Sequence, residues 1–139
     1  MFHKRKYKPL FPEKYIGDPT NIVMRSSWET KFAIWCDKNP QIIKWSSEET
    51  VVPYLSPIDG RTHRYFVDFK IQTSNGITYL VEIKPKHQTL PPAGSRKTKK
   101  YLAEASTFLV NQAKWEYARE YARRRNWQFI VLTEDELGI

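Results

Sequence analysis

The sequence is poor in cysteine and histidine and contains no long apolar run. It has one cysteine, Cys36, so no internal disulfide can form. Its three histidines, His3, His63 and His87, are scattered, which excludes a structural zinc site with four Cys or His ligands at close spacing. No apolar run approaches the length of a membrane span, and residues 1–8 lack the apolar stretch of a signal peptide. We therefore expect an intracellular, soluble protein that has no membrane partner.

The composition instead favours one compact and basic domain. The 139 residues are the length of one ordinary domain, and 40% of them are hydrophobic, including five Trp, eight Tyr and seven Phe. This is enough apolar material for one core. The net charge of +8 favours binding to polyanions such as DNA, RNA or acidic lipid headgroups, although solubility alone is an alternative explanation. We predict a basic N-terminal arm over residues 1–20, loosely packed or disordered, and a single domain over residues 21–139.

Hydrophobic periodicity and turn residues predict the order helix, three strand regions, helix, strand. Ser26 and Glu29 fit the N-cap and the third helical position of a capping box, which begins the first helix. The predicted helices span residues 27–38 and 100–125, the predicted strands span 42–45, 50–54, 62–72, 77–84 and 127–132, and a basic loop spans 86–99. This order predicts a mixed α/β fold with a small central sheet.

The informative segment joins the two strands 62–72 and 77–84 through a turn. Side chains alternate between the two faces of a strand, so one face should carry Tyr65, Val67, Phe69 and Ile71, and the other Phe66, Asp68 and Lys70. In the second strand, Tyr79, Val81 and Ile83 would partner the first set, with Leu80, Glu82 and Lys84 opposite. A two-residue loop would place the apolar side chains of one strand on the same face as the polar side chains of the other. We predict a three-residue loop, Ser74-Asn75-Gly76 with Gly76 left-handed, which sets Asp68 directly opposite Glu82.

Two directly opposed carboxylates repel each other unless a cation lies between them. Mg²⁺, or Mn²⁺ in its place, suits such a pair because Mg²⁺ often takes one or two carboxylates plus water and phosphate. The Lys84 ammonium should point the same way and offset charge on a scissile phosphate. Glu29 is a candidate ligand or base from the first helix. Each residue has a structural alternative: an E-x-K pattern is usually a solvated strand face, and the capping box alone accounts for Glu29.

These residues resemble the PD-(D/E)xK nuclease superfamily. The matching motif is Val67-Asp68 followed by Glu82-Ile83-Lys84, and Val67 departs from the usual proline at a position without catalytic atoms. The segments RYFVDFKI, YLVEIKP and KWEYAREYARRRNWQFIVLTEDEL are also similar to TnsA-type endonucleases and, more closely, to head-completion nucleases of T-even-type tailed phages. The resemblance covers residues 22–136 and implies a restriction-endonuclease-like core. It implies a ligand or base role for Glu29, and a site residue on the second helix, where Gln112 and Lys114 occupy the corresponding place.

Basic side chains that follow Lys84 along the chain are the candidate contacts to double-stranded DNA. They are Lys86, Arg96, Lys97, Lys99 and Lys100. Such contacts to phosphates position DNA without reading its bases, and binding through them should weaken steeply with salt. The basic run at residues 123–125 has a structural alternative, because cations at a helix C-terminus complement the helix dipole.

The sequence therefore predicts a Mg²⁺-dependent DNA endonuclease. The resemblance to phage proteins implies that it processes packaged DNA ends during head completion, with portal or head proteins as partners, in the host cytoplasm or on the virion. A second hypothesis is a non-catalytic protein with a nuclease-like fold that caps the DNA end or binds the portal. A third is a plain basic nucleic-acid-binding module. No small-molecule cofactor is expected.

Overall fold

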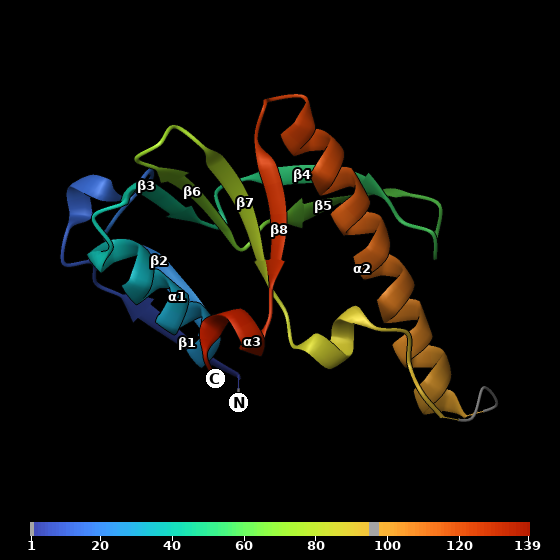
Figure 1. Cartoon of the computed structure of the whole chain (residues 1–139). Coiled ribbons are helices and arrows are strands. Elements are labelled where there is room, and N and C mark those ends of the chain that lie inside the picture. The colour runs from blue at the N-terminus through green and yellow to red at the C-terminus, as the bar shows by residue number, and fades with distance from the viewer. Residues whose placement is uncertain (1, 95–97) are drawn as a thin grey trace.

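The computed structural model describes residues 2–94 and 98–139 (Figure 1). A four-stranded mixed sheet in the order β3-β6-β7-β8 forms its centre, with two separate two-stranded sheets, β1-β2 and β4-β5. The elements are β1 (Phe2–Tyr7), η1 (Pro12–Lys14), β2 (Ile22–Ser26), α1 (Ser27–Lys38), β3 (Ile42–Ser47), β4 (Val51–Leu55), β5 (Thr62–Phe66), β6 (Phe69–Thr73), β7 (Thr78–Ile83), η2 (Lys86–Thr89), α2 (Lys99–Arg123), β8 (Gln128–Leu132) and α3 (Glu134–Leu137). The predicted mixed α/β class is confirmed.

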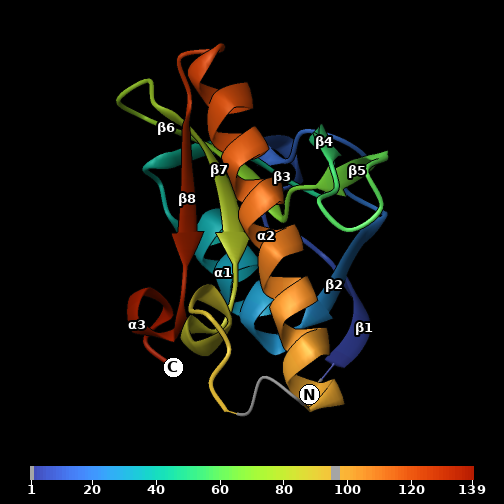
Figure 2. The ribbon, with the colours of Figure 1, turned by 90° about the vertical axis from the view of Figure 1, so that its right-hand side faces the viewer.

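The central sheet is covered on both faces by different elements. Helix α1 and the β1-β2 ribbon lie on one side, and α2 with the β4-β5 hairpin lies on the other (Figures 1 and 2). Two apolar clusters follow from this arrangement. One gathers Phe32, Trp45 and Phe69 under α1, and the other gathers Tyr65, Leu80 and Trp115 under α2. Among the described residues, no helix is long and apolar enough to cross a membrane.

The β6-β7 hairpin has the predicted loop and register. Phe69 pairs with Val81 and Gln72 with Thr78, and the Thr73 N–H donates to the Ile77 carbonyl at 2.9 Å. The loop is therefore the three residues 74–76, and Gly76 has a φ of 86°, which an L side chain rarely adopts. Continued by one pair, this register sets Asp68 opposite Glu82.

The predicted long strand 62–72 is wrong, because the chain changes sheets at Val67 and Asp68. Strand β5 ends at Phe66 and pairs with β4, whereas β6 begins at Phe69 and pairs with β3 and β7. The junction is held by the segment between β3 and β4: the Val67 N–H donates to the Thr50 carbonyl, and the Glu48 N–H donates to the Asp68 carbonyl at 3.1 Å.

This break redistributes the side chains that were expected to share one face. Tyr65 and Val67 pack in the cluster under α2, whereas Phe69 and Ile71 pack in the cluster under α1. The predicted common face of these four residues is therefore also wrong. Asp68 lies at the break itself and not inside a strand, where Asp is disfavoured.

The first twenty residues are held more firmly than the predicted loose arm. Strand β1 pairs with β2, and Tyr15 is buried with its ring 4.8 Å from that of Trp45. The Lys14 ammonium donates to three carbonyls at the C-terminal end of α1, at 2.7 to 2.9 Å. The buried Asp37 carboxylate accepts from the Tyr7 hydroxyl and from two backbone N–H groups of the segment. These contacts join the segment to the main body, while the division into arm and domain stays a prediction.

The predicted helices are confirmed, with one change in the apolar face of α1. The Ser26 side chain accepts from the Glu29 N–H at 3.2 Å and caps α1 as expected. The helical spacing of Trp28, Phe32, Trp35 and Cys36 predicts one buried apolar face, but Trp35 is 46% exposed, and Ala33 and Asp37 are buried instead. The local periodicity could not show that Asp37 has partners from the N-terminal segment.

Candidate active site

Asp68 and Glu82 come together between the central sheet and α2. Glu82 lies near the end of β7 and is 5% exposed, and Asp68 lies at the junction that precedes β6. Asp68 Oδ2 accepts from the Ile83 N–H at 2.8 Å, which places its carboxyl group against β7. The structure thus brings together the two carboxyl groups that the strand register predicted.

Two neutral donors hold the Glu82 carboxylate. The Tyr65 hydroxyl donates to Glu82 Oε2, and the Trp115 indole N–H from α2 donates to the same oxygen at 3.0 Å. Burial and the neighbouring Glu82 raise the pKa of Tyr65 above its ordinary range, so this hydroxyl keeps its proton and acts as a donor. Because both donors act on Oε2, they orient the carboxylate and leave Oε1 for other partners.

Asp68 is in an environment that resists ionisation. Burial is the largest cause that raises its pKa well above 3.8, followed by the charge of Glu82 and a hydrogen bond between the two carboxyl groups. The Ile83 N–H opposes this shift, and the more distant Glu29 adds to it. A shared proton therefore relieves the repulsion between the two carboxyl groups when no cation lies there.

Two ammonium groups complete the polar surroundings. Lys84 follows β7 and is held by its backbone N–H, which donates to the Leu132 carbonyl of β8 at 3.0 Å. Lys114 projects from α2, with its ammonium 5.6 Å from the Tyr65 ring centroid. Burial lowers the pKa of Lys114, Glu82 and Asp68 oppose this shift, and the nearby Lys84 charge adds to it. The site therefore has two cations on the same side as its carboxyl pair.

Glu29 and Glu48 lie at the outer side of the site. The Ser26 hydroxyl donates to Glu29 Oε2 at 3.1 Å, and burial raises the pKa of Glu29, with the charge of Glu48 adding to the shift. Glu48 has a left-handed φ of 55° and pairs with Arg25 at 2.9 Å. Sequence reasoning missed Glu48, because it follows β3 in an ordinary polar run and only the junction at Asp68 brings it close.

The remaining predicted site residues lie less close to the carboxyl groups of Asp68 and Glu82. Gln112 is partly buried on α2, and at about 100° per residue it lies on the far side of Trp115 from Lys114. Lys86 is engaged by α3: its ammonium is 3.1 Å from Asp135, which raises the pKa of Lys86. Lys99 and Lys100 are exposed at the start of α2. Arg96 and Lys97 lie outside the described residues.

The donor set fits a hard divalent cation that keeps part of its water shell. Within residues 2–94 and 98–139, no three His, Cys, Asp or Glu side chains converge closely enough to form a metal shell by themselves. Two neighbouring carboxyl groups are what Mg²⁺ often takes, with water and substrate phosphate as its other ligands. A thiolate or imidazole ligand set, which Zn²⁺ prefers, is not formed by the described side chains around Asp68 and Glu82.

Comparisons with known proteins identify related nucleases. Residues 39–134 match the family model described as the TnsA-like endonuclease N-terminal domain. The chain is also similar to the "Head completion nuclease" of Enterobacteria phage T4, with 41% identity over 142 residues that cover 99% of this chain and 95% of the phage protein. No solved structure matches significantly.

Proposed function

The chain belongs to the TnsA-like endonuclease family, and on this premise we propose that it is a divalent-metal-dependent DNA endonuclease that acts in phage head completion. The observation that carries the proposal is the carboxyl pair of Asp68 and Glu82, placed beside the ammonium groups of Lys84 and Lys114. The name of the phage T4 relative supports the role in head completion. The element order α1, β3, β6, β7, α2, β8 supports a restriction-endonuclease-like core, with β4-β5 inserted.

We assign the metal to Asp68 and Glu82. Glu29 on α1 stays a predicted third ligand, because the described side chains do not bring three such groups together. Mg²⁺ or Mn²⁺ bound there would polarise the scissile phosphate and lower the pKa of a coordinated water. The Tyr65 and Trp115 donors keep Glu82 Oε2 engaged and orient the carboxylate that would hold the cation. The proton that Asp68 shares with Glu82 must leave when the cation binds.

Lys84 and Lys114 supply the positive charge that a phosphodiester needs on entering a site with two carboxyl groups. Lys84 directs its ammonium to the attacking water or to the phosphoryl oxygens, where charge grows in the transition state. Burial lowers the pKa of Lys114, so its ammonium gives up a proton more readily than that of an exposed lysine. Gln112 remains a predicted contributor from α2.

The proposed substrate is double-stranded DNA near an end left by packaging, and the proposed partners are portal or head proteins. Lys99 and Lys100 are exposed at the N-terminal end of α2, where they can contact phosphates that flank the cut. The Lys86 ammonium is available to a phosphate only if it leaves Asp135.

A cleavage assay with matched variants tests this function. Supercoiled and linear DNA are incubated with Mg²⁺, with Mn²⁺ and with EDTA, for the wild-type chain and for Asp68→Asn, Lys84→Met and Lys38→Met. Lys38 is exposed at the end of α1, away from the carboxyl pair, so it controls for the loss of one positive charge. We expect metal-dependent cleavage that is lost in the first two variants and retained in the third.

The alternative of a DNA-end-capping protein makes a different prediction. In that case DNA binding without cleavage would be seen in every metal condition and would be unchanged in Asp68→Asn and Lys84→Met. Such a result would overturn the enzymatic proposal and favour a nuclease-like fold used for structure.

A further inference from the structure

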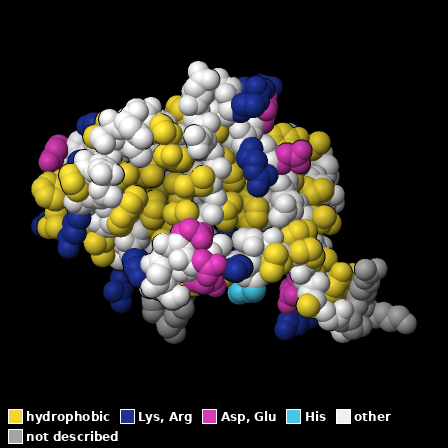
Figure 3. Space-filling view, in the orientation of Figure 1, with side chains coloured by type: hydrophobic (Ala, Val, Ile, Leu, Met, Phe, Trp, Pro, Cys, Tyr) yellow, Lys and Arg dark blue, Asp and Glu magenta, His cyan; other side chains and the backbone are white. Residues whose placement is uncertain are grey.

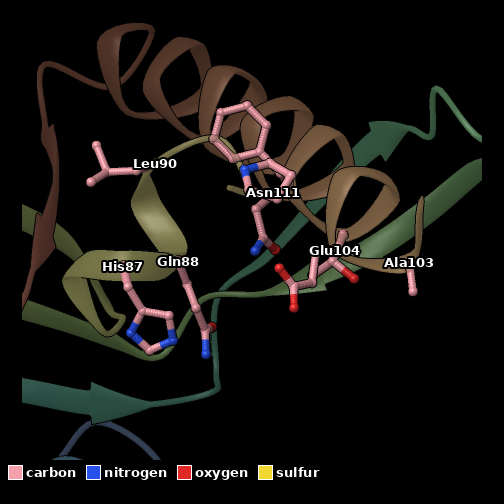
Figure 4. Close-up of a pocket in the computed structure, with 9 residues that line it drawn as sticks. His87, Gln88, Leu90, Ala103, Glu104 and Asn111 are labelled. Carbon is pink, nitrogen blue, oxygen red and sulfur yellow. The ribbon is translucent and has the colours of Figure 1, made fainter. Parts of the chain in front are cut away.

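A pocket of about 350 Å³ lies beside the proposed metal site, between the segment that follows β7 and the N-terminal half of α2 (Figure 4). Its polar lining includes Gln88 from the segment and Glu104, Thr107 and Asn111 from α2. The volume is within the range of about 300–1,000 Å³ that small-molecule sites in proteins have. Nothing in the proposed phosphodiester chemistry uses this pocket.

The pocket and the metal site are built on the same two pieces of chain. His87, which lines the pocket, follows Lys84 by three residues, and Asn111 precedes Trp115 by one helical turn. At 1.5 Å per residue, Asn111 is displaced along α2 by only about 6 Å from the indole that donates to Glu82. A nucleotide adjacent to the scissile phosphate is therefore within reach of the pocket.

Asn111 shows that the pocket is prepared for a polar ligand. The residue is only 6% exposed, and its side chain makes no hydrogen bond with any residue in the part of the chain that the structure describes, yet its amide is not among the fully buried atoms that lack a partner, so it still opens into the pocket. Figure 4 shows its amide directed from α2 toward Gln88, into the pocket. An amide that opens into a pocket without a protein partner is free to donate to and accept from a ligand there.

The chemistry of the lining matches a nucleobase. An Asn amide presents one donor and one acceptor side by side, which is the pattern that pairs with the edge of a base. Phe108 and Leu90 also line the pocket and supply apolar surface for the faces of a flat ring. Stacking on such side chains together with hydrogen bonds to the base edge is how proteins hold unpaired bases.

We propose that this pocket takes one unpaired nucleobase of the DNA strand being cut, next to the scissile phosphate. This inference rests on the proposed endonuclease function and specifies its substrate: DNA with a frayed, single-stranded or junction nucleotide at the cut, in preference to an uninterrupted duplex. A base inside a duplex cannot enter the pocket unless it leaves its stack, which adds to the barrier for that substrate.

The test compares cleavage of three oligonucleotide duplexes that differ at one place only. One is fully paired, one has a single unpaired base beside the cut, and one has an abasic nucleotide at the same position. Wild-type chain is compared with Asn111→Leu, which keeps the branched shape and removes the amide, and with Gln88→Ala, which changes an exposed residue of η2. Glu116→Gln, exposed on α2 and absent from the pocket lining, is the control.

We expect the wild-type chain to cleave the unpaired-base substrate with a kcat/KM about tenfold higher than that of the other two. One contact to a base edge typically discriminates between substrates by about this factor. Asn111→Leu and Gln88→Ala should lose this preference without losing cleavage of the abasic substrate, and Glu116→Gln should retain it. Asn111→Leu should also melt close to the wild-type temperature, because it removes no hydrogen bond between described residues of the folded chain.

Different failures have different meanings. If the wild-type chain cleaves DNA but shows no preference for the unpaired base, or if both variants keep that preference, the pocket inference is overturned and the endonuclease proposal stands. If no substrate is cleaved in any metal condition, the proposed function itself fails. If free deoxynucleoside monophosphate binds the wild-type chain and not Asn111→Leu, with no effect on DNA cleavage, the pocket is a site for a free nucleotide and the inference is wrong.

Discussion

Asp68→Asn should make the metal-free chain more stable, although it removes a residue of the active site. Asparagine keeps an oxygen that accepts from the Ile83 N–H. It removes the carboxyl group whose pKa is raised by burial and by Glu82. The substitution therefore removes an unfavourable interaction and keeps the favourable one. It should also abolish the stabilisation that Mg²⁺ brings to the wild-type chain.

The size of this gain in stability follows from the strand geometry. Directly opposed residues have Cβ atoms about 5 Å apart, and two unit charges at that distance repel by about 3 kcal/mol at an effective dielectric constant of about 20. Protonation of one carboxyl group relieves part of this repulsion, so the expected gain is about 1–3 kcal/mol. For a chain of this size, that corresponds to an increase of roughly 3–10 °C in Tm.

The gain should depend on pH in a defined direction. Because the pKa of Asp68 in the folded chain is raised above 3.8, the folded chain binds more protons than the unfolded chain at pH values between the two pKa values. The stability of the wild-type chain therefore falls as the pH rises above 3.8, toward the folded pKa, and that of Asp68→Asn does not fall for this reason. The two melting temperatures should approach each other at acidic pH.

Thermal unfolding followed by circular dichroism, in EDTA and in Mg²⁺ across this pH range, measures all three effects. Asp37→Asn is a matched control, because Asp37 is a fully buried aspartate but accepts three hydrogen bonds from the N-terminal segment. It should lose about 1–3 kcal/mol. A lower Tm for Asp68→Asn in EDTA at pH 7.5 would refute the reasoning, as would equal stabilisation of both Asp68 forms by Mg²⁺.

Three further predictions follow from single contacts. Trp115→Phe and Tyr65→Phe each remove one donor to Glu82 Oε2, so Mn²⁺ affinity measured by calorimetry should fall about 10–100-fold, and unchanged affinity would contradict the positioning role. Lys14→Met leaves three carbonyls at the end of α1 without their ammonium and should cost about 1–3 kcal/mol in urea unfolding, whereas a loose N-terminal arm would show no loss. Gly76→Ala meets no neighbour but must adopt a φ of 86°, so it should cost about 1 kcal/mol in the same assay; a neutral result would count against the three-residue loop.

The sequence by itself determined the local features of this protein. Ser26 and Glu29 specified where α1 begins, and alternation along residues 77–84 specified which side of β7 carries Glu82. The loop at Gly76 and its consequence, Asp68 opposite Glu82, also followed, because a one-residue slip would have exchanged the buried and exposed faces. These features depend on residues that are close together along the chain, so a linear pattern contains them.

Only the tertiary structure decided the features that join distant segments. The change of sheets at Asp68, the approach of Glu48 and Lys114, and the partners of Asp37 each arise from contacts between residues far apart in the chain. No local pattern distinguishes Lys114 from other lysines of a basic helix, or Trp115 from other core aromatics. Their roles come from burial against one carboxylate, and burial is a property of how layers pack, which hydrophobic periodicity constrains but does not specify.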